Sequence, residues 1–199
     1  MPTAVARRRG VSAWNAANAL TLLRLLLVPV FVALLFADSG GGTGWRIAAA
    51  SVFVLAGVTD LVDGEVARRR GVVTDVGKIA DPIADKALNG AALVGLSVLQ
   101  ELPWWVTGVI LSREIAVTLL RLAVLRHGVI AASRGGKVKT VAQGVAIALF
   151  VLPLGAGWQL FAGLVMAFAL AVTLLTGADY AVRALRLHRR GAAAGGGSP

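Results

Sequence analysis

The sequence predicts an all-α integral membrane protein with six transmembrane helices and both termini in the cytoplasm. Hydrophobic residues make up 57% of its 199 residues, and the mean hydropathy is +0.79. Soluble domains contain about 45–50% apolar residues. The apolar residues gather into runs that reach roughly 20 residues, the length of helix that crosses a bilayer. The basic residues lie at the ends of these runs and predominantly on one side, as the positive-inside rule requires.

Six apolar runs are expected to form the spans, and short polar or glycine-rich segments separate them. The glycine-rich segment Asp38–Gly44 predicts a loop, and shorter turns are expected at Glu101–Pro103 and Leu154–Gly157. The expected spans are Leu20–Ala37, Trp45–Ala67, Val76–Leu99, Pro103–Leu125, Val138–Ala156 and Trp158–Arg183. The corresponding domain division is a basic N-terminal segment over residues 1–17, a membrane domain over 18–187 and a disordered cytoplasmic tail over 188–199.

The charge distribution predicts the orientation. The formal net charge is +10, and Arg46 is the one basic residue expected in an outer loop. The inner side would receive Arg7, Arg8, Arg9, Arg68, Arg69, Arg70, Arg126, Arg134, Lys137, Lys139, Arg186, Arg189 and Arg190. In a soluble protein such a charge would suggest nucleic acid, but basic residues at span ends indicate topology and anionic headgroups instead. The absence of cysteine excludes disulfides and thiol chemistry.

Four carboxylates lie inside or at the edges of the second and third spans, where charge is unfavourable. They are Asp60, Asp63, Asp81 and Asp85. A charge at the centre of a membrane helix costs about 2.5–3.5 kcal/mol by insertion scales. Four neighbouring carboxylates would also repel one another, so a compensating positive charge is expected.

Helical spacing predicts that these carboxylates converge on a metal site. Asp60 and Asp63 are spaced i, i+3, and Asp81 and Asp85 are spaced i, i+4, so each pair lies on one helix face. Two such pairs on neighbouring helices could hold two divalent ions, Mg²⁺ or Mn²⁺, which suits phosphoryl chemistry. The alternative is that individual aspartates, Asp81 before Pro82 above all, cap helices at loop edges.

The pattern Asp60-x2-Asp63-Gly64-x2-Ala67-Arg68-x8-Gly77-x3-Asp81-x3-Asp85 resembles the signature of the CDP-alcohol phosphotransferases. This resemblance implies that Asp60, Asp63 and Asp81 bind metal and the CDP diphosphate, and that Asp85 also touches metal and is the general base. The CDP site it implies comprises Asp60, Asp63, Gly64, Ala67, Arg68, Gly77, Asn18 and Thr21.

Other segments are similar to the phosphatidylglycerophosphate synthase branch of that family. They are Asn18–Arg24, where Ala17 stands in place of the usual proline, Asp81–Lys86, Ser112–Glu114 and Ser133–Thr140 with Gln143. The resemblance implies transfer of the phosphatidyl group from CDP-diacylglycerol to glycerol 3-phosphate, with CMP as second product, in phospholipid biosynthesis. It also implies a homodimer in the inner or plasma membrane, with the active site facing the cytoplasm.

A dianionic acceptor phosphate needs cations, and the fourth and fifth spans contain them. Arg113 lies about 15 Å into its span at 1.5 Å per residue, so we expect it to face a wet cavity. With Arg121, Lys137 and Lys139 it could form a phosphate clamp. The alternative is that these side chains snorkel to the interface. Glu114 is expected to pair with Arg121, at i, i+7 on the same helix.

Two other functions stay open at this stage. One is the same chemistry with another acceptor, such as inositol phosphate, serine or phosphatidylglycerol. The other is a cation transporter, because intramembrane carboxylates alone would permit an ion site. Against a transporter, no internal repeat is evident in the sequence.

Overall fold

The computed structural model describes the backbone of residues 16–70, 75–124 and 134–195. Within these it describes the side chains of residues 22–59, 86–120, 135–155 and 157–185. Throughout the described backbone the regular structure is helical. The elements are α1 (Ala16–Phe36), the short 3₁₀ helix η1 (Ala37–Gly40), α2 (Thr43–Arg70), α3 (Asp75–Val98), α4 (Trp104–Val124), α5 (Arg134–Val151) and α6 (Ala156–Gly195).

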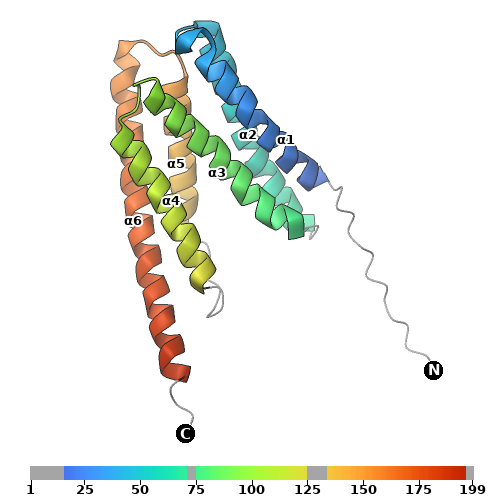
Figure 1. Ribbon diagram of the computed structural model, residues 1–199, viewed down its shortest axis with the longest axis vertical. Helices are drawn as coiled ribbons and strands as arrows, with labels where there is room; N and C mark the ends of the chain where they lie inside the picture. The colour runs from blue at the N-terminus through green and yellow to red at the C-terminus, as the bar shows by residue number, and fades with distance from the viewer. Residues whose placement is uncertain (1–15, 71–74, 125–133, 196–199) are drawn as a thin grey trace, which may run out of the picture.

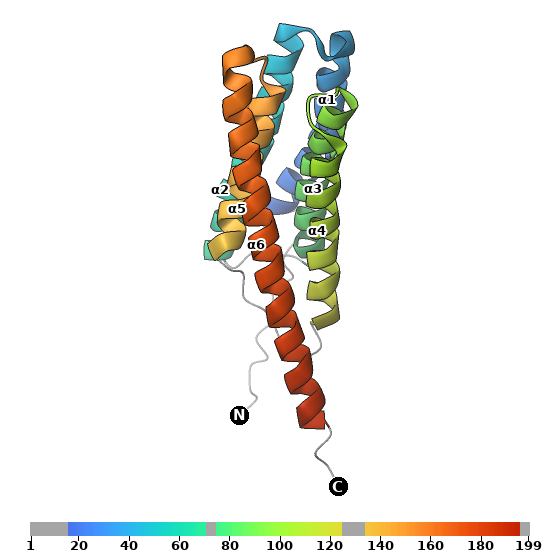
Figure 2. The same cartoon turned by 90° about the vertical axis from the view of Figure 1, so that its left-hand side faces the viewer.

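The six long helices of the described backbone run up and down a single elongated bundle (Figure 1 and Figure 2). Helix α1 begins and α6 ends at the same end of the bundle, here called the N/C end. The connections α1–α2, α3–α4 and α5–α6 lie at the opposite end, here called the far end. For the part of the chain that the structure describes, the expected six helices and the all-α class are confirmed, and this arrangement agrees with an even number of spans.

Packing divides the bundle into two groups of three helices. Helix α1 packs closely on α2 and α3, and α6 packs closely on α4 and α5. The two groups meet mainly where α2 lies against α5 and where α3 passes α4 and α5. The apolar core joins both groups, from Phe31 and Leu35 of α1 to Ile147 of α5. Gly95 allows the close approach of α1 and α3, because a Cβ there would lie 2.6 Å from Cδ2 of Leu35.

The outer surface of the bundle is strongly apolar. Side chains such as Leu26, Leu160 and Leu175 are 60%, 73% and 71% exposed. Two segments have the length and hydropathy of a membrane span among the described residues, Leu22–Gly40 and Gly157–Leu185, and Thr43–Thr59 and Lys86–Val98 are shorter apolar helices. So many exposed large apolar side chains indicate a surface that faces something other than water.

The structure differs from the expected boundaries at several places, among them the following three. The expected loop Asp38–Gly44 is shorter, because η1 makes a tight turn with left-handed backbone at Asp38 and Ser39 and α2 begins at Thr43. Helix α5 begins at Arg134, before the expected start at Val138. Helix α6 continues past residue 188, where the tail was expected to begin, as far as Gly195. Alanines 192–194 favour helix, which offsets the glycines around them.

At the far end, Arg46 joins three parts of the chain. This buried arginine of α2 donates to both carboxylate oxygens of Glu101, at 2.5 and 2.6 Å. It also donates to the carbonyl oxygens of Val151 and Phe150, at 2.8 and 2.6 Å. The last carbonyls of a helix have no partner within the helix, so Arg46 caps α5 while neutralising Glu101.

Replacing Arg46 by methionine should lower the free energy of unfolding by roughly 3 kcal/mol. That value is at the low end for breaking a buried ion pair, because Glu101 keeps partial access to water. The matched control is Arg183→Met. Arg183 forms an exposed i, i+4 pair with Asp179 on α6, and such pairs contribute about 0.3–0.5 kcal/mol. Denaturant unfolding of both variants in one detergent measures their free energies of unfolding. An equal loss in the two variants would contradict the stabilising role assigned to Arg46.

Candidate active site

The backbone brings the two acidic helix segments together at the N/C end. Helix α2 ends at Arg70 and α3 begins at Asp75, so only four residues separate them. Asp60 is ten residues before the end of α2 (70 − 60) and Asp85 is ten residues after the start of α3 (85 − 75). At 1.5 Å per residue both lie about 15 Å from the connection, and therefore at a similar level.

The other residues expected around CDP lie on these same helices and on α1. Asn18 and Thr21 are on the first turns of α1. Gly64, Ala67 and Arg68 follow Asp63 along α2, and Gly77 precedes Asp81 on α3. The side chains of all these residues, and of the four aspartates, lie outside those that the structure describes. The described side chains therefore do not test the expected metal site.

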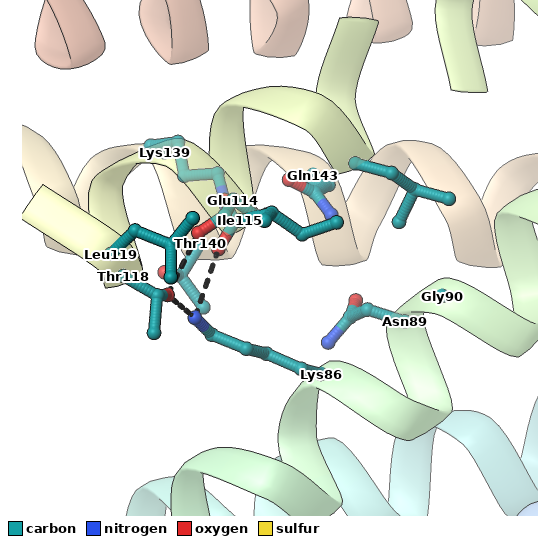
Figure 3. A pocket seen from close by; sticks show the side chains of 11 residues that line it. Lys86, Asn89, Gly90, Glu114, Ile115, Thr118, Leu119, Lys139, Thr140 and Gln143 are labelled. Carbon is teal, nitrogen blue, oxygen red and sulfur yellow. Dashed lines mark hydrogen bonds and ion pairs between the residues drawn. The ribbon is translucent and has the colours of Figure 1, made fainter. Parts of the chain in front are cut away.

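A cavity of about 310 Å³ opens where the two helix groups meet (Figure 3). Helix α3 contributes Lys86, Asn89 and Gly90 to its wall, and α4 and α5 contribute the rest. Those residues are Leu111, Glu114, Ile115, Thr118, Leu119, Lys139, Thr140 and Gln143. The lining combines two lysines, one carboxylate, two amides and a hydroxyl pair with apolar side chains, which suits a small polar molecule.

Glu114 is the centre of the charged cluster in this cavity. Its Oε1 accepts from Lys139 Nζ and, at 3.2 Å, from Arg113 Nη1. Its Oε2 lies 4.0 Å from Lys86 Nζ, which also donates to Thr118 Oγ1. The side chains of Glu114 and Lys139 are only 20% and 8% exposed. One carboxylate thus bridges cations from α3, α4 and α5, and the four groups together carry a formal charge of +2.

Arg113 points away from the cavity and fastens α4 to α6. Its Nε donates to the carbonyl oxygen of Thr173 at 3.0 Å, and its Nη2 donates to Thr176 Oγ1 at 2.8 Å. Gly177 lies against this side chain, where a Cβ would be 3.1 Å from both Cγ and Nε of Arg113. The guanidinium is therefore enclosed by α6 and Glu114, and it does not line the cavity.

Of the four cations expected around the acceptor phosphate, the three whose side chains are described do not gather in one place. Lys139 is buried on the cavity wall, whereas Lys137, two residues earlier on α5, is exposed. Arg113 is bonded to α6, and the side chain of Arg121 lies outside the described set. Among the clamp residues whose side chains are described, Lys139 therefore lines the cavity.

Glu114 has partners that sequence reasoning did not name. Among the described side chains it pairs with Lys139 and Arg113, whereas the expected partner Arg121, seven residues along the same helix, has a side chain outside the described set. Lys86 was named only as the end of the segment Asp81–Lys86, and Thr118 and Asn89 were not singled out. A usable signal existed, because polar residues recur at helical spacing in otherwise apolar spans, as Glu114 with Thr118 and Lys139 with Gln143.

A family model described as CDP-alcohol phosphatidyltransferase matches residues 14–175, which is most of the chain and includes every expected site residue. The chain belongs to the CDP-alcohol phosphatidyltransferase family. The matched region runs from just before α1 into α6, so the six-helix bundle is the domain of this CDP-alcohol phosphatidyltransferase.

Curated relatives agree with this membership. The chain is 55% identical over 172 residues to a probable phosphatidylglycerophosphate synthase of Mycobacterium tuberculosis, covering 86% of this chain and 82% of the relative. It is 38% identical over 180 residues to the CDP-diacylglycerol–glycerol-3-phosphate 3-phosphatidyltransferase of Bacillus subtilis, covering 84% and 93%. The enzyme of the same name from Escherichia coli K12 is 39% identical over 168 residues, covering 81% and 90%.

Gly177→Val should destabilise this CDP-alcohol phosphatidyltransferase by roughly 1–3 kcal/mol, the usual range for overpacking a filled site. The new side chain would displace Arg113 from Thr173 and Thr176. Gly163→Val is the control on the same helix, because a Cβ at Gly163 meets nothing within 4 Å. Thermal unfolding in detergent measures both. A Gly163 variant that loses as much stability as the Gly177 variant would refute the tight contact.

Proposed function

We propose that this chain transfers the phosphatidyl group of CDP-diacylglycerol to glycerol 3-phosphate, forming phosphatidylglycerophosphate and CMP. The observation that carries the proposal is its 55% identity over 172 residues to a mycobacterial protein named a probable phosphatidylglycerophosphate synthase. Two further relatives bear the name of the same activity at 38% and 39% identity.

The proposed membrane arrangement has all six helices crossing the inner or plasma membrane, with the N/C end in the cytoplasm. Its support is the apolar exterior together with the clustering of arginine and lysine toward segments at that end. Glycerol 3-phosphate would then enter from the cytoplasm, and CDP-diacylglycerol would enter laterally from the bilayer. A homodimer belongs to this proposal through the family resemblance.

The proposed metal ligands are Asp60, Asp63, Asp81 and Asp85, holding two Mg²⁺ or Mn²⁺ ions. The donor set fits, because carboxylate oxygens are the ligands these hard cations prefer. The backbones of α2 and α3 carry the two pairs at a similar distance from their short connection. When bound, the ions would offset the negative charge of the diphosphate and of the departing CMP.

In the proposed reaction Asp85 accepts the proton of the primary hydroxyl of glycerol 3-phosphate. The oxygen forms a bond to the phosphorus that bears diacylglycerol, and the bond from that phosphorus to CMP breaks. Gly64 and Ala67 would leave room for cytidine, Asn18, Thr21 and Gly77 would complete that site, and Arg68 would bind a phosphate oxygen. Lys139, which lines the cavity, would supply positive charge for the acceptor phosphate together with Lys137 and Arg121, while Arg113 is engaged by Glu114 and α6.

The test is an acceptor panel with purified protein, CDP-diacylglycerol and either Mg²⁺ or Mn²⁺. Labelled glycerol 3-phosphate should enter lipid with release of an equal amount of CMP, and a chelator should stop turnover. Inositol phosphate, serine and phosphatidylglycerol are the competing acceptors. Preference for any of them would overturn the assignment of glycerol 3-phosphate.

Asp85→Asn should lower kcat by about 10²–10⁴-fold, the usual contribution of a general base. The matched control is Asp179→Asn, which removes an exposed carboxylate paired with Arg183 on α6. That variant should keep wild-type turnover. An Asp85→Asn enzyme with full activity would contradict the assignment of the base.

A further inference from the structure

Glu114 lies at the boundary between the two halves of the bundle. Lys86 stands on α3, in the N-terminal group of helices, while Lys139 stands on α5, in the C-terminal group. Glu114, on α4, is the one carboxylate among the described residues that line the cavity between them (Figure 3). It contacts both lysines, one through each oxygen.

Glu114 is itself held in place from the side of α6. Arg113, its neighbour in sequence, donates to Glu114 and to two groups of α6. Thr118 donates to the backbone carbonyl of Glu114 at 2.7 Å and receives a hydrogen bond from Lys86. The carboxylate is thus fastened to α6 through Arg113, and it reaches across the cavity to α3 and α5.

The same boundary separates the residues proposed for the two substrates. Those proposed for the metals and for CDP lie on α1, α2 and α3, whereas those proposed for the acceptor phosphate lie on α4 and α5. Lys86 directly follows Asp85, and Lys139 lies two residues after Lys137. A contact that joins Lys86 to Lys139 therefore joins the base to the acceptor side.

We infer that Glu114 is a positioning residue for the transfer reaction. It holds the ammonium groups of Lys86 and Lys139 at one carboxylate and so sets the spacing between the donor half and the acceptor half of the bundle. This inference rests on the proposed function, and it assigns Glu114 no contact with either substrate.

Loss of the carboxylate should push the halves apart for an electrostatic reason. Glu114→Gln raises the formal charge of the cluster of Lys86, Arg113, Glu114 and Lys139 from +2 to +3. Two ammonium groups would then face each other across the cavity with no carboxylate between them among the described residues, and low local dielectric strengthens their repulsion. Because acceptor attack depends on close alignment, a small displacement suffices to slow it.

The first measurement is a comparison of Michaelis constants. In Glu114→Gln the KM for glycerol 3-phosphate should rise about tenfold, while the KM for CDP-diacylglycerol should stay within about twofold. Glu114→Asp keeps the charge on a shorter side chain, so its KM for glycerol 3-phosphate should lie between that of Glu114→Gln and that of the wild type. Adding Lys86→Gln to Glu114→Gln restores the charge to +2 and should recover part of the loss.

Glu101→Gln is the matched control. Glu101 also pairs with an arginine, Arg46, but at the far end of the bundle, away from the cavity. It should lower the unfolding temperature and leave both KM values at their wild-type levels. If Glu101→Gln raised the KM for glycerol 3-phosphate as much as Glu114→Gln does, the effect would be one of general stability, and the inference would be wrong.

The second measurement does not depend on activity. Because the chain has no cysteine, spin labels can be attached at Leu26→Cys on α1 and Ala116→Cys on α4, both exposed and in opposite halves. In Glu114→Gln the distance distribution should move to longer values and broaden. In Glu101→Gln it should match the wild type.

The outcomes separate this inference from the proposed function. An active wild type whose Glu114→Gln variant keeps its acceptor KM and its label distances overturns the inference alone. A wild type that transfers to no acceptor overturns the proposed function and, with it, the role assigned to Glu114 in the reaction. Raised acceptor KM together with longer distances supports both.

Discussion

The constraint on which the rest of this structure depends is that a charge in an apolar bundle must meet an opposite charge or a polar group. Burying an unpaired ion is far more costly than burying a pair whose hydrogen bonds are satisfied. Arg46 meets Glu101 and two carbonyls, and Arg113 and Lys139 meet Glu114. Because the partners belong to different segments, satisfying the charges also determines which helices are neighbours.

These polar contacts do what the apolar core cannot. Burial of Phe31, Leu35 and Ile147 favours association of the helices but is non-directional, so it tolerates rotation and sliding. The contacts of Arg46 set the register at the far end, and those of Glu114 set it midway along the bundle, beside the cavity. Between the Arg46 contacts and the Glu114 contacts, the helices that they join have little freedom to slide along one another.

The sequence predicted the helices well because hydropathy and length are local properties. The six helices, the turn before Pro103 and the family signature on α2 and α3 all follow from patterns within short windows. The partners of Glu114 did not follow, since Lys139 is 25 residues away and only packing makes them neighbours. Arg113 was expected to face water, but its guanidinium donates a hydrogen bond to a backbone carbonyl of α6. A sequence pattern does not reveal which backbone carbonyl can accept such a bond.

A membrane enzyme with one lipid substrate and one soluble substrate must align two sites that open in different directions. Here the helices proposed for the lipid nucleotide form one tightly packed group, and those proposed for the acceptor form another. A cavity lies at the boundary, so apolar packing there is incomplete, and charged groups carry the contact instead. An ionic contact is suited to that place, because it keeps the halves in register while leaving the space beside it open to a polar molecule.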